Sequence, residues 1–267
     1  MNKCSCDMSS TKKRVEKAVK KAYGQLWTSQ RESKSKSYNS GFSPHEALIK
    51  ELAPRNGMKI LDIGSGNGDT VLAIAEHVKP NGKAVGIDFS PKGIALAKKK
   101  AKERNLENVA EFHLANVVKL PFPDSTFDAV ISECVVCLIP DKQIALNEKV
   151  RVLKPSGRVL MHDVITRIPI PRVITENEAL YCDCIGGAVS MEDYVRMMEK
   201  AGLTNIKTVD FTKKAQKTLN RYILEQAINI EDEQKFQEAI SFVRKGGIGY
   251  ALFSGEKAKS KLAELHK

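Results

Sequence analysis

Apolar positions follow two different periods along the chain. Short apolar runs predict strands over 59–63, 83–87, 109–114, 128–133 and 158–163, with weaker ones over 206–211 and 248–253. Between them, apolar side chains recur every three to four positions. This spacing predicts helices over 70–78, 90–104, 142–152, 191–201, 219–228 and 231–243, and we expect a turn over 154–157. Strands that alternate with helices favour an α/β fold with a mostly parallel, doubly wound sheet.

The beginning of the chain differs from the rest. Residues 1–14 show no apolar period and are expected to be disordered, whereas 15–27 predict an amphipathic helix. We therefore divide the chain into two parts. Residues 1–43 form a basic, partly disordered N-terminal segment that could carry a lid helix. Residues 44–267 form one domain, in which the irregular stretch 164–195 is expected to cap a substrate.

Charge and composition limit the partners. The net charge is +11, and the basic excess lies at the two ends of the chain, whereas 51–196 is balanced. Without an aromatic ladder, this distribution favours solvated basic helices over a nucleic-acid footprint. No apolar run is long enough to insert into a membrane, and the N-terminus lacks the apolar core of a signal peptide. We expect a cytoplasmic protein with reduced cysteines.

A glycine-rich turn follows the first predicted strand. Gly64, Gly66 and Gly68 alternate with other residues, Ser65 among them, and Asp62 stands just before the turn. Glycines let the backbone approach a ligand closely, and parallel sheets bind ligands beyond the carboxyl ends of their strands. The spacing differs from that of dinucleotide-binding loops. Because Asp62 would repel phosphate, the turn favours a cationic ligand, and S-adenosylmethionine carries both an ammonium and a sulfonium group.

Three further strand ends support this cofactor. Asp88 ends the second strand, where a carboxylate can accept hydrogen bonds from both ribose hydroxyls. Asn116 follows the third strand and could bind the adenine amino group between apolar neighbours. The fourth strand ends near the expected methyl group. The expected cofactor-binding residues in the turn are Asp62, Gly64, Ser65, Gly66 and Gly68. Those at the other strand ends are Asp88, Phe89, Ala115, Asn116, Val117 and Glu133.

Four segments together resemble a known family. They are LDIGSGNG at 61–68, GIDFS at 86–90, LPFPDSTFDAVIS at 120–132 and VLKPSGRVLMHD at 152–163. In this order they resemble the class I S-adenosylmethionine-dependent methyltransferases. The resemblance implies a Rossmann-like, mostly parallel seven-stranded sheet with a reversed final hairpin, N-terminal helices and a small cap.

Two segments are similar to a narrower group, the arsenite methyltransferases. They are VISECVVCLIPDK at 130–142 and CIGGAVSMEDY at 184–194. The resemblance implies that Cys184 supplies a thiolate to trivalent arsenic, which is soft and thiophilic. The arsenic lone pair would then attack the methyl group in an SN2 displacement, so the enzyme supplies alignment and desolvation rather than a general base.

The cysteine pattern also departs from that family. No cysteine lies in 35–56 or after Cys184, so the family's usual three-thiolate site cannot form in the usual way. Cys134 and Cys137, with Cys182 and Cys184, could build a different soft-ligand site. Core packing and a metal or redox role stay open for these cysteines. Their spacing is not that of a zinc site, and we predict no metal.

Glu133 replaces an asparagine of that family. A half-buried carboxylate there is expected to have a raised pKa and could act as a base toward an oxygen, nitrogen or carbon nucleophile. We therefore take Cys184, Cys134, Cys137 and Glu133 as candidate catalytic residues.

The leading hypothesis is methylation of a small-molecule acceptor of the arsenite type. Quinone or sterol C-methylation is the alternative. A protein or nucleic-acid substrate, as in a protein or RNA methyltransferase, is not favoured, and a cofactor-binding protein without catalysis stays open. A homodimer is compatible with the sequence.

Overall fold

The computed structural model describes residues 5–26 and 43–259. Its strands are β1 (Lys59–Ile63), β2 (Lys83–Asp88), β3 (Ala110–Leu114), β4 (Phe127–Glu133), β5 (Leu153–Thr166), β6 (Leu203–Asp210) and β7 (Ile248–Lys257). Its helices are α1 (Ser5–Leu26), α2 (Pro44–Leu52), α3 (Asp69–Val78), α4 (Pro91–Glu103), the 3-10 helix η1 (Val136–Leu138), α5 (Lys142–Val152), α6 (Arg172–Thr175), α7 (Glu178–Cys182), α8 (Met191–Lys200), α9 (Thr212–Ala227) and α10 (Glu233–Arg244).

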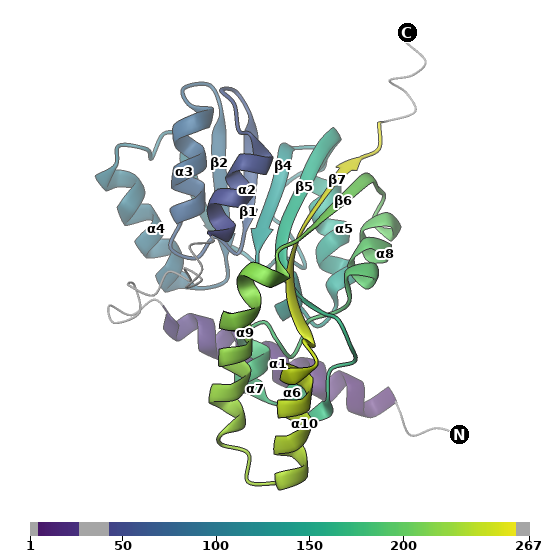
Figure 1. Ribbon diagram of the computed structural model, residues 1–267. Coiled ribbons are helices and arrows are strands. Elements are labelled where there is room, and N and C mark those ends of the chain that lie inside the picture. The colour runs from purple at the N-terminus through teal and green to yellow at the C-terminus, as the bar shows by residue number, and fades with distance from the viewer. Residues whose placement is uncertain (1–4, 27–42, 260–267) are drawn as a thin grey trace.

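All seven strands form one sheet, in the order β3-β2-β1-β4-β5-β7-β6 (Figure 1). The first five are parallel to one another, and β7 runs antiparallel between β5 and β6. The strand order reverses direction between β1 and β4. Ligands of such sheets bind at this switch point, beyond the carboxyl ends of the strands. The predicted mostly parallel sheet with a reversed final hairpin is confirmed.

Helices cover both faces of the sheet. Apolar side chains of α2, α3 and α4 pack on one face, with Leu48, Leu72 and Ala97 almost fully buried. On the other face, α5 and α8 bury Leu146 and Met198. Side chains cap several of these helices: Ser90 accepts a hydrogen bond from the N–H of Gly93 at the start of α4, for example.

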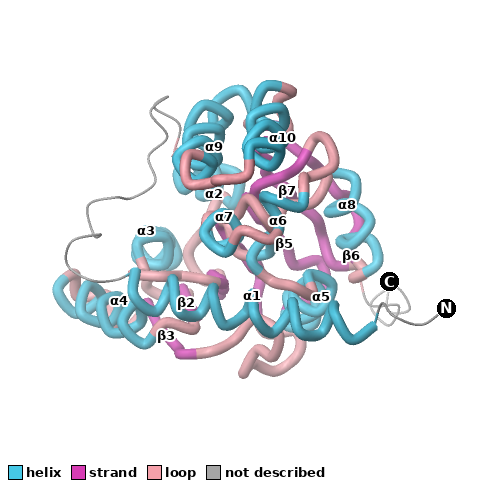
Figure 2. The backbone as a smooth tube through the Cα atoms, turned by 90° about the horizontal axis from the view of Figure 1, so that it is seen from below, coloured by secondary structure: helices cyan, strands magenta, loops and turns pink. Residues whose placement is uncertain are grey.

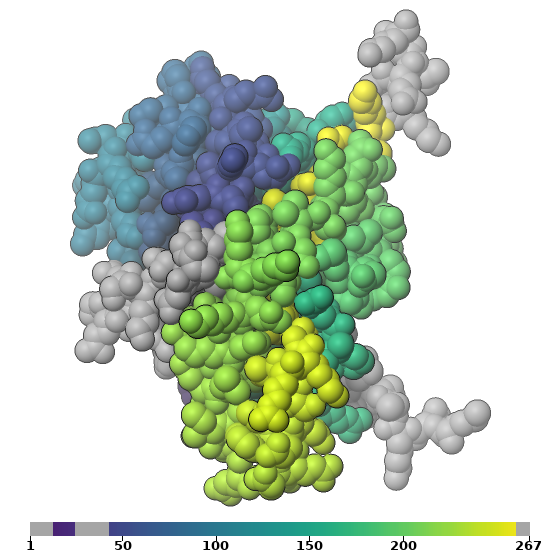
Figure 3. All heavy atoms as spheres, viewed as in Figure 1, coloured from purple at the N-terminus to yellow at the C-terminus, as the bar shows by residue number. Residues whose placement is uncertain are grey.

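Helices also gather at the carboxyl end of the strands. They are α6 and α7, which lie within the predicted cap, and α9 and α10, which come between β6 and β7 (Figure 1). Of these, α9 packs against β7 and α7, and α10 packs against α6. In the space-filling view, α9 and α10 fill the lower part of the visible face (Figure 3). The structure thus adds 212–244 to the elements around this end of the sheet.

The N-terminal helix completes this arrangement. Seen from below, α1 lies across the end of the molecule and passes from α4 toward α5 (Figure 2). It packs against α4 and α7. Val15 and Val19 of α1 are buried in an apolar cluster that contains Leu180 and Cys184. A lid role for 1–43 stays a prediction, but the described part of α1 does contact the cap.

Two local predictions were wrong. The helix begins at Ser5, although 1–14 was predicted to be disordered. The predicted amphipathic helix, which Val15 and Val19 anchor, thus continues back to Ser5. Residues 154–157 were predicted to form a turn before the fifth strand, but they belong to β5. Leu153 already pairs with Phe127, and the register shifts before Arg158 pairs with Ala129, so 154–157 form a bulge within the strand.

Candidate active site

The glycine-rich turn has no room for side chains at two positions. Gly64 and Gly68 have φ angles of 77° and 83°, which favour glycine. A Cβ on Gly64 would collide with the side chain of Val135, and one on Gly68 would lie 2.8 Å from the Phe112 ring. The turn therefore lies directly against the loop that follows β4.

Asp88 holds the turn from the neighbouring strand. Its carboxylate accepts hydrogen bonds from the backbone N–H of Gly66 at 3.0 Å and of Ser90 at 2.8 Å. Burial raises the pKa of Asp88, and these backbone hydrogen bonds partly oppose that rise. The predicted ribose-binding carboxylate therefore also fixes the shape of the cofactor loop.

Asp62 is the most deeply buried of the predicted acidic residues. Asp62 is only 6% exposed, and this burial raises the pKa of its carboxyl group well above the usual range. The charges of Glu133 and Asp88 raise this pKa further, whereas the ammonium of Lys149 lowers it. Three carboxyl groups from β1, β2 and β4 thus lie near one another. Such a cluster attracts a cation, because a positive charge stabilises the ionised carboxylates.

The residues after β3 were predicted to bind the adenine. The N–H of Ala115 donates to the carbonyl of Asp88 at 3.0 Å, and Val117 is buried. The side-chain carbonyl of Asn116 accepts a hydrogen bond from the N–H of Val118 at 3.2 Å. Phe89 meets the ring of Tyr23 edge-on, with 6.2 Å between ring centroids.

These residues fit the predicted cofactor. The Ser65 hydroxyl is buried in the turn and has no hydrogen-bond partner among the described residues. A buried polar atom of this kind indicates a ligand or water that completes its hydrogen bonds. In the turn, this hydroxyl therefore indicates a small polar ligand.

Three of the predicted cysteines meet beside this cofactor site. The thiol of Cys184 hydrogen-bonds the thiol of Cys137 and also donates to the carbonyl of Cys134 at 3.5 Å. Burial raises the pKa of Cys137 to about 12. Cys182 differs, because it is partly exposed and its pKa is raised by burial and then by Asp183 and Glu178 rather than by the other cysteines.

Two of these cysteines have an unfavourable backbone conformation. Cys134 and Cys184 have φ angles of 52° and 71°, in the left-handed region. A residue with a side chain is strained there by about 1–3 kcal/mol, and such strain is concentrated at functional sites. Glycine would be less strained at either position. This strain is evidence against simple core packing for these two thiols.

Buried charges hold the loop that carries Cys137. Asp163 accepts hydrogen bonds from the N–H groups of Val136 and Cys137, at 3.1 and 3.4 Å. Lys142 donates to the carbonyls of Cys137 and Ile139, at 3.3 and 3.0 Å. The loop is therefore fixed at its N–H groups by a carboxylate and at its carbonyl groups by an ammonium.

Comparison with known proteins identifies the family. A family model described as a methyltransferase domain matches residues 54–202, more than half of the chain. This chain belongs to that methyltransferase family. The predicted methyltransferase family is thereby confirmed.

Two curated relatives illustrate the range of acceptors. An arsenite methyltransferase of Halobacterium salinarum is 35% identical over 156 residues, which cover 58% of this methyltransferase and 39% of the relative. A demethylmenaquinone methyltransferase of Staphylococcus aureus is 33% identical over 187 residues, covering 62% of this chain and 76% of the relative. This chain thus spans less than half the length of the arsenite relative, and both predicted acceptor classes occur among proteins similar to it.

Solved structures confirm the predicted class I, Rossmann-like fold. A geranyl diphosphate C-methyltransferase of Streptomyces coelicolor has a TM-score of 0.64 at 18% identity, over 80% of this chain and 78% of the other. The [4+2]-cyclase SpnF has a TM-score of 0.62 at 21% identity, over 81% and 80%. At these identities the likeness shows the fold alone.

The sequence missed several residues that organise the methyltransferase site. They are Asp163, Lys142 and Lys149. Lys149 is fully buried in α5 and donates to the Ser132 hydroxyl at 2.5 Å. Burial lowers its pKa to about 8, although the charges of Asp163 and Asp62 oppose that change. In the sequence Lys149 is one of many lysines on predicted helices, so nothing marked it.

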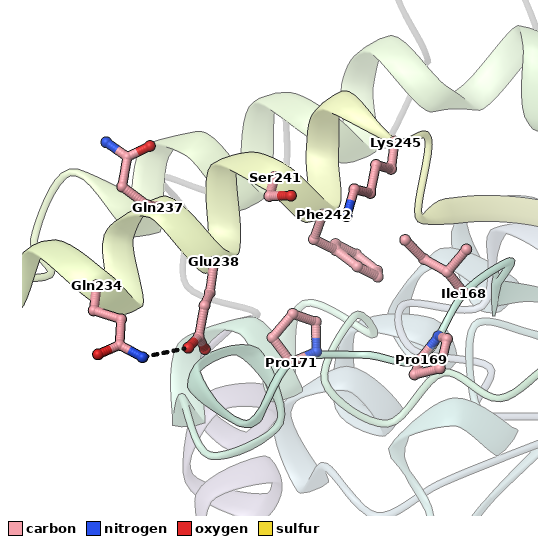
Figure 4. A pocket seen from close by; sticks show the side chains of 9 residues that line it. All are labelled: Ile168, Pro169, Pro171, Gln234, Gln237, Glu238, Ser241, Phe242 and Lys245. Atoms are coloured by element: carbon pink, nitrogen blue, oxygen red, sulfur yellow. Dashed lines mark hydrogen bonds between the residues drawn. The ribbon is translucent and has the colours of Figure 1, made fainter.

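Three further features concern metal-ligand groups, membrane-spanning helices and a surface groove outside the cluster of Cys134, Cys137 and Cys184. In the part of the chain that the structure describes, no three His, Cys, Asp or Glu side chains are grouped as metal ligands. None of the helices within 5–26 and 43–259 is long and apolar enough to cross a bilayer. A groove of about 510 Å³ separates α10 from the segment 168–171, with Phe242 and Pro171 at its centre (Figure 4). It contains none of the predicted site residues.

A substitution at Gly187 tests the packing of the predicted cap against the loop that carries Cys137. A Cβ there would collide with the carbonyl oxygen of Cys137 and lie 2.9 Å from the Tyr181 ring. We expect Gly187→Ala to lower the free energy of unfolding by about 1–3 kcal/mol, because neither group can move freely. Chemical denaturation measures this change. Gly24→Ala is the matched control, since Gly24 lies in α1 with nothing within 4 Å of the added atom. Equal stability of both variants would contradict the prediction.

Proposed function

We propose that this methyltransferase transfers a methyl group from S-adenosylmethionine to a small thiophilic acceptor, with trivalent arsenic as the substrate class. The observation that carries the proposal is the contact between the thiols of Cys137 and Cys184 beside the cofactor loop. Val135, which lies between Cys134 and Cys137 in the chain, touches the position of Gly64. The soft ligands and the cofactor loop are therefore neighbours.

The cofactor of the enzyme is S-adenosylmethionine, as expected for its family and class I fold. When bound, it supplies a methyl group activated by a sulfonium centre. Asp88 is positioned to accept hydrogen bonds from a ribose, and Ser65 has an unused buried hydroxyl. Asp62 and Glu133 supply negative charge for a cationic ligand. The structural neighbour from Streptomyces coelicolor contains S-adenosyl-L-homocysteine.

The thiols would hold the acceptor by ligand exchange. Each As–O bond of arsenite is replaced by an As–S bond, and the thiol proton leaves with the hydroxyl group as water. Cys137 and Cys184 are already in contact, whereas the Cys134 thiol is turned toward Tyr250. Cys134, whose charge acts on Cys137, would supply the third As–S bond. Asp163 and Lys142 keep the loop in place while the thiols bind.

C-methylation of a quinol is the second candidate. The Glu133 carboxyl lies near Asp62, at the end of β4, where it could accept a proton from an oxygen or carbon acid. The demethylmenaquinone methyltransferase of Staphylococcus aureus is matched over more of its length than the arsenite relative. This candidate makes the thiols dispensable.

An acceptor assay tests the proposal. Labelled S-adenosylmethionine is incubated with the full chain and either arsenite plus a small thiol or a demethylated naphthoquinol. Methylated arsenic is the expected product. A methylated quinol without methylated arsenic would replace the proposal by the second candidate. Normal cofactor binding without either product would contradict both acceptors. A homodimer and a cytoplasmic location stay predictions.

A further inference from the structure

Each of the two strained cysteines lies beside a tyrosine hydroxyl. The Cys134 thiol is 3.5 Å from the hydroxyl of Tyr250, and the Cys184 sulfur is 3.9 Å from the hydroxyl of Tyr23. Tyr250 belongs to β7 and Tyr23 to α1, so the two rings reach the thiols from opposite ends of the chain. Neither tyrosine has a role in the site described so far.

Tyr250 is held rigidly. The residue is fully buried, and its backbone N–H donates to the Thr212 hydroxyl at 3.3 Å. Its ring lies edge-on to the ring of His162, with 5.4 Å between centroids. Burial lowers the pKa of His162 to about 4, so this neighbour is neutral at pH 7. The phenol therefore faces Cys134 with little freedom to turn away.

Tyr23 contacts both the cysteine segment 182–184 and Phe89, which was predicted to bind the cofactor. Its hydroxyl donates to the carbonyl of Cys182 at 3.0 Å while it also lies beside the Cys184 sulfur. Its ring meets Phe89, the residue after Asp88. The buried side chains of Val15 and Val19 anchor the same helix to the cap. Tyr23 thus joins the cofactor side to the thiol side.

A sulfur that binds a soft acceptor loses its proton and can then only accept hydrogen bonds. In the structure the Cys134 thiol donates to the Tyr250 hydroxyl, so loss of the thiol proton reverses this hydrogen bond and the phenol becomes the donor. Tyr23 can likewise rotate its hydroxyl proton from the Cys182 carbonyl to the Cys184 sulfur. Hydrogen bonds to charged or strongly polarised acceptors are stronger than neutral ones.

We propose that Tyr23 and Tyr250 are positioning residues of the thiol site, which donate hydrogen bonds to the sulfurs of Cys184 and Cys134 when these bind the acceptor. This inference rests on the proposed function. Cys137 has a different partner, because its thiol hydrogen-bonds the carboxylate of Asp163. The three sulfurs are therefore not equivalent, and two of them depend on phenols.

Arsenite binding tests the inference. The full chain and its variants Tyr23→Phe, Tyr250→Phe and the double variant are compared by equilibrium dialysis. Phenylalanine keeps each ring and removes only the hydroxyl. We expect each single change to weaken arsenite binding by about fivefold to tenfold, and the double change by about their product. The dissociation constant for S-adenosylmethionine should stay unchanged, because phenylalanine keeps the ring contact of Tyr23 with Phe89. Tyr222→Phe is the matched control, since Tyr222 packs at the edge of the same apolar cluster and its ring lies beside the Arg221 guanidinium.

A second readout does not depend on arsenite. The alkylation rates of individual cysteines by iodoacetamide are followed by mass spectrometry. Tyr250→Phe should slow alkylation of the partly exposed Cys134 and leave that of Cys182 unchanged, because the phenol stabilises the Cys134 thiolate. Unchanged alkylation and arsenite binding in both variants would overturn the tyrosine role and leave the thiol site standing. If the parent chain binds no arsenite, the proposed function fails, and the alkylation pattern alone decides whether the Tyr250 phenol acts on the Cys134 sulfur.

Discussion

Replacement of Cys184 by serine is expected to lower arsenite methylation by about 100-fold or more. A serine hydroxyl is a hard ligand that does not replace a thiolate on a soft centre. Cys184 is 1% exposed and contacts Cys137 and the backbone of Cys134, so its loss removes one half of the preformed thiol pair. Product formation from labelled cofactor measures the effect.

Cys182→Ser provides the matched control for this prediction. Cys182 lies two positions earlier in the same segment, but its side chain is partly exposed and is not influenced by the other thiols. We expect near-normal methylation from this variant. Both variants should bind S-adenosylmethionine normally, because Cys184 lies outside the glycine-rich turn. Retained activity in Cys184→Ser would refute the thiol site, and the acceptor would then be sought among quinols.

Replacement of Asp88 by asparagine is expected to weaken S-adenosylmethionine binding by about 100-fold, or about 3 kcal/mol. The change removes the charge that accepts two backbone hydrogen bonds and that would accept those of a ribose. An amide can keep only part of this pattern, because its NH₂ group cannot accept a hydrogen bond. Isothermal titration calorimetry measures the dissociation constant.

The pH dependence of this binding provides a second check. Burial raises the pKa of Asp88, so its carboxylate loses its charge at a higher pH than an exposed aspartate does. Affinity in the parent chain should therefore be present above that raised pKa and decline as the pH falls through it. The contribution of Asp88 to this decline should be absent from Asp88→Asn. Asp69→Asn is the control, since Asp69 is an exposed partner of Lys100. Equal losses in both variants would mean that general charge, rather than the Asp88 site, governs binding.

Much of the fold could be predicted from the sequence, because it depends on short-range patterns. The first strand was predicted over 59–63 and β1 spans Lys59–Ile63. The helix 142–152 also agrees with α5. Both are regular segments whose apolar side chains face the core. The two wrong predictions concern polar stretches, in which no apolar period marks a helix or a strand. Ser5 begins a helix in a polar stretch, and 154–157 continue a strand through a bulge.

The grouping of the residues predicted to bind the cofactor was predictable for a similar reason. Asp62, Gly64 and Ser65 are neighbours in the chain, and Asp88 ends the adjacent parallel strand. Carboxyl ends of parallel strands meet at one edge of the sheet, so the order of elements is enough to bring these residues together. The sequence could not tell which cysteines meet, because that depends on the direction of each side chain after its strand or helix ends.

The sequence by itself thus determined the class I methyltransferase fold and the grouping of the glycine-rich turn with Asp62 and Asp88. Only the tertiary structure decided that Cys137 and Cys184 touch, that Cys182 does not join them, and that phenols lie beside two of the sulfurs. Tyr23 and Cys184 are 161 positions apart, and Cys134 and Tyr250 are 116 apart. Periodicity records which face of an element is buried, but it holds no information about which distant side chains meet there. That is settled by the packing of α1, the cap and β7 around one end of the sheet.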